Sequence, residues 1–95
     1  MMNYRVIYLD TALADMLEIK LYLEHYSSSA WDNFLSKMEK YTKNLEQFPN
    51  IGERYKSYRR LVCDDYLIFY KVNSKKKVVE IVRFLHGKID IRNRL

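Results

Sequence analysis

The fold is decided by residues 57–86, which read SYRRLVCDDYLIFYKVNSKKKVVEIVRFLH. β-Branched and aromatic residues dominate this stretch, and the short polar segments Cys63–Asp65 and Asn73–Lys76 have the composition of hairpin turns. The pattern therefore predicts three successive strands that form an antiparallel meander. The side chains that suggest chemistry rather than packing lie on this meander or just after it: Arg59, Arg60, Arg83, His86 and Lys88.

The residues before the meander predict one strand and two helices. Residues 4–9 alternate as a strand does, and two apolar stripes at helical spacing follow. The first stripe comprises Ala12, Met16, Ile19, Leu23 and Tyr26, and the second comprises Phe34, Met38, Tyr41, Leu45 and Phe48. We expect the two helices to form a hairpin that buries both stripes against one face of the sheet.

Helix ends are also marked in the sequence. Asp10 or Thr11 is expected to cap the first helix, and Ser29 with Asp32 matches a capping box for the second. Pro49 stops the second helix because proline cannot continue its hydrogen-bond ladder. Residues 53–57 are then expected to form a polar, basic approach to the meander.

Alternation assigns the strand side chains to two faces. In the strand beginning at Tyr66, one face is expected to carry Tyr66, Ile68, Tyr70 and Val72. In the last strand, one face is expected to carry Val79, Ile81, Arg83 and Leu85. His86 then lies on the face opposite Arg83, unless a β-bulge intervenes.

Length and composition predict one domain over residues 1–95 in a cytoplasmic protein. The single cysteine, Cys63, excludes an intramolecular disulfide and suits a reducing compartment. Cys63 and two histidines lack the paired spacing of a zinc site, so we expect no metal. No segment approaches the 18 uncharged residues of a membrane span, so no membrane partner is expected.

Charge is divided unevenly along the chain. The net charge is +5, but residues 1–51 carry five Lys/Arg against seven Asp/Glu, whereas residues 52–95 carry twelve against five. Positive charge is thus concentrated where the sheet is predicted. A basic sheet indicates an anionic partner, either nucleic acid or an acidic protein segment.

Several short motifs occur in a specific order over nearly the whole chain. They are an N-terminal Tyr-Arg-Val strand, the helical segment Asp15–Ile19, Leu45–Pro49, Tyr58–Leu61, Tyr66–Val72, and Val79–Gly87 followed by Asp90. In this order they resemble the RelE/ParE toxin superfamily of bacterial type II toxin–antitoxin systems. The resemblance implies an α+β fold of order β-α-α-β-β-β: an N-terminal strand, a helical hairpin and a three-stranded antiparallel meander with a short C-terminal tail.

The resemblance also implies a function. Such toxins arrest growth, and some stabilise plasmids, until a cognate antitoxin neutralises them by wrapping around them. RelE-like members cleave mRNA on the translating ribosome, whereas ParE-like members poison DNA gyrase without being hydrolases. Neither branch implies a small-molecule cofactor.

Candidate site residues follow from the two branches. If the protein is a metal-independent endoribonuclease, the cations Arg60 and Arg83 would stabilise the phosphorane-like charge and His86 would transfer protons. Nucleic-acid or target binding is assigned to Arg59, Lys88 and Arg92.

The ParE branch fits the residues better. Ribonuclease members typically have an arginine after the aromatic residue that starts the third strand, and here Leu67 follows Tyr66. Residues 89–95 also lack the late catalytic tyrosine of those enzymes. The preferred interpretation is therefore a gyrase-directed toxin. The alternatives are a ribosome-dependent mRNA endoribonuclease and an inactive member retained for binding or regulation, so whether the chain is an enzyme stays open.

Each candidate also has a purely structural explanation. Arg59 and Arg60 are adjacent on a strand and point to opposite faces, so at least one is expected to be solvated or paired across the sheet. Arg83 would equally suit a partly buried ion pair with Glu53 or the carboxy terminus. His86 would equally suit a packed or capping position at the end of a strand.

Overall fold

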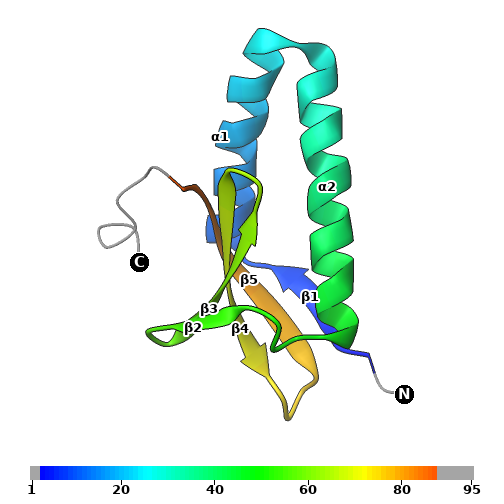
Figure 1. Ribbon diagram of the computed structural model, residues 1–95, viewed down its shortest axis with the longest axis vertical. Helices are drawn as coiled ribbons and strands as arrows, with labels where there is room; N and C mark the ends of the chain where they lie inside the picture. The colour runs from blue at the N-terminus through cyan, green and yellow to red at the C-terminus, as the bar shows by residue number, and fades with distance from the viewer. Residues whose placement is uncertain (1–2, 88–95) are drawn as a thin grey trace.

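The computed structural model describes residues 3–87, which form a five-stranded sheet and a helical hairpin (Figure 1). The elements, in chain order, are β1 (Arg5–Tyr8), α1 (Asp10–Tyr26), α2 (Ser28–Gln47), β2 (Glu53–Tyr55), β3 (Tyr58–Cys63), β4 (Tyr66–Asn73) and β5 (Val78–His86). The spatial order of the strands is β1-β5-β4-β3-β2. β1 runs parallel to β5, and every other pairing is antiparallel. The expected α+β fold, with its helical hairpin before a meander, is confirmed.

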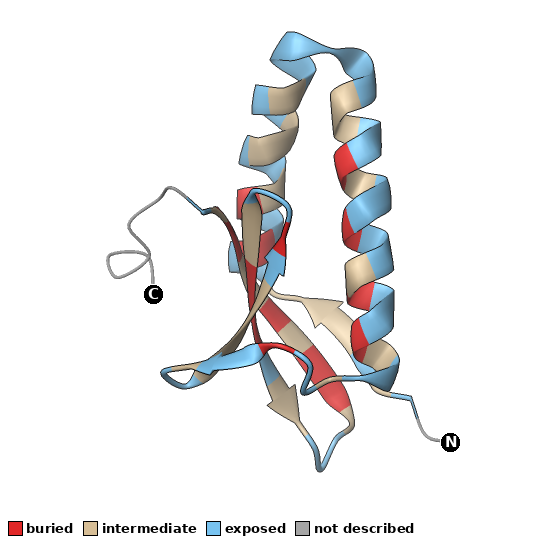
Figure 2. Ribbon diagram, viewed as in Figure 1, coloured by how far each residue is buried: buried red, intermediate tan, exposed pale blue. Residues whose placement is uncertain are grey.

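The core lies between the helical hairpin and one face of the sheet, as the two apolar stripes predict (Figure 2). Its buried members are Ala12, Phe34, Met38, Leu45, Cys63, Ile68, Tyr70, Val79, Ile81 and Phe84. The predicted stripes were wrong at their last positions. Tyr26 is 68 % exposed at the C-terminal end of α1, and Phe48 is 56 % exposed just after the end of α2.

Both predicted helix caps were wrong. α1 begins at Asp10, so Leu9 occupies the cap position, and no side chain caps the helix there. The Thr11 hydroxyl donates instead to the Val82 carbonyl of β5 at 2.6 Å. For α2 the cap is Ser27, whose Oγ accepts a hydrogen bond from the backbone N–H of Ser29.

The sheet has one strand more than expected. Residues 53–55 do not merely approach the meander but pair with β3, with Glu53 opposite Arg60 and Tyr55 opposite Tyr58. Lys56 adopts a φ of 55°, the left-handed conformation that a tight two-residue hairpin requires. The predicted polar segment is therefore an edge strand, and the sheet has five strands instead of four.

A β-bulge at Val82 changes the faces of β5. Phe69 lies opposite Arg83, and Tyr70 lies opposite Ile81, so Val82 has no partner in β4. The core face of β5 therefore carries Val79 and Ile81 before the bulge and Phe84 after it. Alternation had predicted that Arg83 shares the face of Val79 and Ile81. This prediction was wrong, because the bulge shifts the alternation by one residue.

Candidate functional site

Arg60 and Arg83, the two arginines assigned to catalysis, lie in one row across the sheet. Arg60 of β3 is opposite Phe69 of β4, and Phe69 is opposite Arg83 of β5. Directly opposed residues share a face, and Ile68 and Tyr70 on either side of Phe69 belong to the core. The side chains of both arginines therefore leave the backbone on the sheet face that the helices do not cover. With two strand spacings between them, their backbones are about 10 Å apart.

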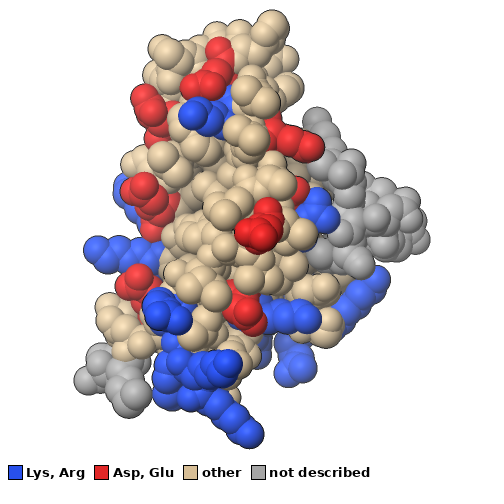
Figure 3. Space-filling view, turned by 180° about the vertical axis from the view of Figure 1, so that it is seen from behind, with Lys and Arg blue, Asp and Glu red and all other residues tan. Residues whose placement is uncertain are grey.

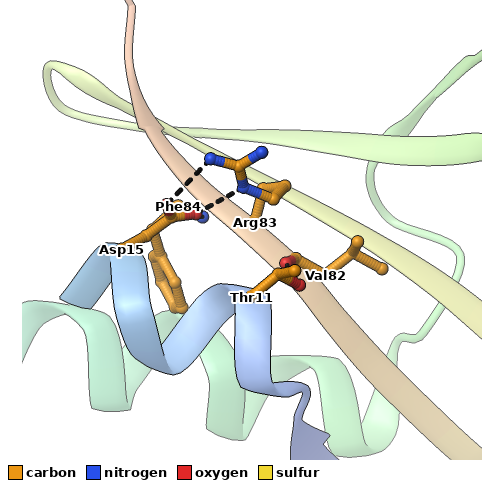
Figure 4. A network of polar contacts seen from close by, with 5 residues as sticks. All are labelled: Thr11, Asp15, Val82, Arg83 and Phe84. Carbon is orange, nitrogen blue, oxygen red and sulfur yellow. Dashed lines mark hydrogen bonds and ion pairs between the residues drawn. The ribbon is translucent and has the colours of Figure 1, made fainter. Parts of the chain in front are cut away.

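Arg83 is bound to Asp15 of α1 in a two-pronged ion pair (Figure 4). Its Nε donates to Asp15 Oδ2 at 2.7 Å, and its Nη2 donates to Oδ1 at 2.9 Å. Both side chains are largely buried, at 18 % and 10 % exposed. The hydrogen bond to Asp15 raises the pKa of Arg83 further above its ordinary value. The sequence interpretation had named Glu53 or the carboxy terminus as the partner and had missed Asp15; Glu53 binds Arg60 instead, and the carboxy terminus lies outside the described residues.

The N-terminal part of α1 covers the backbone of β5 beyond the point where β1 pairs with β5. β1 pairs with β5 only as far as Ile81. Beyond that point Thr11 donates to the Val82 carbonyl, and Asp15 Oδ2 accepts a hydrogen bond from the Phe84 N–H at 3.0 Å (Figure 4). Side chains of α1 thus take the place of a neighbouring strand, and they protect this edge of β5. Asp15 is structural in this arrangement as well as a partner for Arg83.

Arg60 is also paired across the sheet. Its Nη2 forms an ion pair with Glu53 Oε1 of β2, and its guanidinium lies 5.3 Å from the centre of the Tyr55 ring. Its Nε is buried and has no hydrogen-bond partner among the described residues. The positive charge of Arg60 is therefore balanced within the β2–β3 hairpin.

His86 lies on the helical side of the sheet. It is opposite Tyr66 in the β4–β5 ladder, and the two rings are 5.4 Å apart. Together with Asp15, Glu18 and Tyr22 it lines an open groove of about 380 Å³ beside α1. The prediction that His86 and Arg83 lie on opposite faces is confirmed, because the bulge precedes both residues.

Arg59 points to the face opposite that of Arg60, into the loop that follows α2. Its Nη1 donates to the carbonyls of Gly52 at 2.8 Å and Asn50 at 3.3 Å. The N–H of Gly52 donates to the Tyr70 hydroxyl at 2.8 Å. Burial raises the pKa of that hydroxyl, and the Gly52 hydrogen bond partly offsets the rise. Lys88 and Arg92, assigned to target binding, lie outside the described residues.

The described candidates do not form one catalytic centre. Arg60 and Arg83 share a sheet face and are each held by a carboxylate, whereas His86 is on the other face. Cys63 is buried, and this burial raises its pKa to about 12, so it is not a nucleophile at neutral pH. Within residues 3–87, no group of three or more His, Cys, Asp or Glu residues could hold a metal ion. No helix in this range is long and apolar enough to cross a membrane.

Three solved structures similar to this chain are of toxin–antitoxin systems. The chromosomal ParDE toxin–antitoxin system from P. aeruginosa gives a TM-score of 0.73 at 17% identity, covering 90% of this chain and 97% of that chain. The RelBE2 toxin–antitoxin complex from Mycobacterium tuberculosis gives a TM-score of 0.69 at 18% identity, covering 88% of this chain and 98% of that chain. The archaeal RelE–RelB complex from Pyrococcus horikoshii OT3 gives a TM-score of 0.58 at 21% identity, covering 92% of this chain and 98% of that chain. At these identities the likeness establishes the fold.

Sequence comparison supplies the family. Among curated proteins no sequence matches the chain. A family model does match, over residues 4–91, and it describes the ParE toxin of the type II toxin–antitoxin system parDE. That match spans both helices and all five strands of the sheet. The chain therefore belongs to the ParE toxin family of type II toxin–antitoxin systems.

Proposed function

We propose that this toxin stops growth by acting on DNA gyrase, and that a cognate antitoxin neutralises it. The observation that carries the choice of target is the pairing of the candidate catalytic cations. Arg83 is bound to Asp15 and Arg60 to Glu53, while His86 is on the opposite face of the sheet. Membership of the ParE family supports the same target.

RNA cleavage makes chemical demands that these residues do not meet together. Attack by a 2′-hydroxyl on its own phosphate needs a proton acceptor, a proton donor and cations around one phosphorus atom. A guanidinium that already neutralises a carboxylate adds little net positive charge at that position. Arg60 and Arg83 would also have to act together with a histidine on the other side of a β-sheet.

An antitoxin partner is supported by the surface of α1. Leu13, Leu17 and Leu21 recur every four residues on the outer face of this helix and are 50%, 57% and 63% exposed. Exposed apolar patches of this kind mark sites of protein association. The solved relatives are themselves complexes between toxins and antitoxins.

Two assays on the purified toxin separate the targets. With gyrase, ATP and relaxed plasmid, we expect reduced supercoiling and accumulation of cleaved DNA. With translating ribosomes, we expect mRNA to remain intact. Ribosome-dependent cleavage of mRNA that disappears in His86→Ala would overturn the proposal in favour of an endoribonuclease. Normal growth on expression of the toxin alone would overturn both activities and leave a binding or regulatory role.

A further inference from the structure

A second groove lies at the end of the sheet, away from Arg83 and His86. It has a volume of about 290 Å³ and is bounded by the loop after α2, the β2–β3 hairpin and the end of β4. Three cations line it, Arg54, Arg59 and Lys71, and no acidic residue does so. Figure 3 shows lysine and arginine side chains gathered at the end of the molecule farthest from the α1–α2 turn.

The cations of this groove form no ion pair within residues 3–87, although Glu80 lies opposite Lys71 in the β4–β5 ladder. Within residues 3–87 the ion pairs are Arg60 with Glu53, Arg83 with Asp15 and Lys37 with Asp64, so none involves a cation of the groove. Arg59 is held by two neutral carbonyls, which position the guanidinium without neutralising it. A guanidinium has five N–H donors, so donors remain for an anion in the groove.

The walls of the groove are fixed by local contacts. Lys71 and Tyr58 share the sheet face of Phe69 and Arg60, opposite to the face of Arg59, and Lys71 Nζ lies 4.8 Å from the centre of the Tyr58 ring in a cation–π contact. The Tyr70 hydroxyl is tied to Gly52 N–H. Ser57 and Ser74, which carry hydroxyl groups, also line the groove. Cations together with hydroxyl donors match the oxygens of a phosphate group.

Charge continues beyond the groove along two hairpins. Lys56 occupies the β2–β3 turn, and Lys75, Lys76 and Lys77 occupy the β4–β5 turn. A ligand with a single phosphate would not use this extended surface. Beside Tyr4, Tyr58 and Tyr70, Val72 is the only aliphatic residue that lines the groove within the described chain, so an apolar peptide side chain would find no aliphatic pocket there.

We propose that this groove binds backbone phosphates of nucleic acid, independently of base sequence. The site is distinct from the positions assigned to catalysis and does not depend on gyrase being the target. Phosphate contacts of this kind give affinity that falls steeply with salt, because each neutralised phosphate releases condensed counterions.

The test is fluorescence anisotropy of the purified toxin with a labelled duplex of arbitrary sequence, titrated at several salt concentrations. We expect Arg54→Ala and Lys71→Ala each to weaken binding about three- to tenfold and to lower the slope of log affinity against log salt by about 1. Lys71→Arg is expected to restore both quantities. Lys40→Ala is the matched control, because it removes the same charge from an exposed position on α2 outside the groove.

Each other outcome overturns the proposal. Equal losses for Lys40→Ala and Lys71→Ala would mean attraction by overall charge only. Displacement of the duplex by polyglutamate as readily as by unlabelled duplex would identify a site for acidic polypeptides. Displacement by low concentrations of inorganic phosphate would identify a single-anion site. Circular dichroism and urea denaturation of every variant distinguish lost contacts from lost folding.

Discussion

At Asp15 one carboxylate serves two groups of β5, the guanidinium of Arg83 and the N–H of Phe84. Asp15→Asn removes the negative charge that Arg83 binds through Nε and Nη2. We expect the free energy of unfolding to fall by about 3 kcal/mol, as for other buried ion pairs that lose one partner. Urea denaturation at neutral pH measures this loss.

The double variant shows whether the loss belongs to the pair. Arg83→Met retains a long side chain but removes the charge. Asp15→Asn with Arg83→Met should cost less than the sum of the two single changes, because each single change already removes the same ion pair. Strictly additive losses would contradict the coupling that the structure shows.

Cys63 makes stability depend on alkaline pH. Burial raises the pKa of its thiol from 9.0 to about 12, so the folded protein keeps a proton that the unfolded chain releases. The resulting stabilisation is complete below about pH 9 and is lost as the pH rises towards 12, by up to about 1.4 kcal/mol per pH unit. We expect the free energy of unfolding of Cys63→Ala to decline less steeply over this range.

Urea denaturation of both proteins at a series of pH values checks the expectation for Cys63. The pKa values of Tyr66 and Tyr70 are also raised by burial, but both tyrosines remain in the variant. The difference between the two stability curves therefore isolates the thiol. Parallel curves would show that Cys63 does not contribute.

At the scale of elements, strand β2 depends on close packing at Gly52. A Cβ at this position would lie 2.8 Å from the Arg60 carbonyl oxygen and 2.8 Å from the Tyr70 hydroxyl. The backbone carbonyl cannot move without disturbing the β2–β3 pairing. We expect Gly52→Ala to cost about 1–3 kcal/mol and to increase hydrogen exchange at the β2–β3 amides, measured by NMR.

Two controls accompany Gly52→Ala. A Cβ at Gly87 would meet nothing closer than the Asp65 carbonyl at 3.3 Å, so Gly87→Ala should cost less. Tyr70→Phe removes the hydrogen bond from Gly52 without adding a clash, and should loosen β2 only in part. If Gly52→Ala left exchange in β2 unchanged, the proposed dependence on this contact would be wrong.

The sequence predicted the elements whose apolar residues repeat regularly, and not those that arise from distant contacts. Both helices and the strands β3, β4 and β5 follow from periodicity. β2 has no apolar repeat and exists because Glu53 and its neighbours pair with β3. The bulge at Val82 could not be located, because the run from Val78 to Leu85 contains apolar residues on both faces.

The same limit applies to the candidate site. The excess of positive charge in the second half of the chain was visible in the sequence. Which arginines are neutralised was not, because Asp15 and Arg83 are 68 residues apart and only the docking of α1 on β5 brings them together. Arg54 and Lys71 were not singled out as site residues, and they line one groove only because β2 folds back on β3, which in turn pairs with β4.

For the whole molecule, the structure separates an apolar surface on α1 from a basic surface at the hairpin end (Figures 1 and 3). If the antitoxin covers the leucines of α1, Leu17→Glu places a charge within that contact and should weaken antitoxin binding at least about tenfold. Calorimetry with the cognate antitoxin measures the loss, and expression of both proteins should no longer restore growth. Ser36→Glu, an equal charge change at an exposed position of α2, should be neutralised normally. Full neutralisation of Leu17→Glu would exclude this face of α1 from the antitoxin interface.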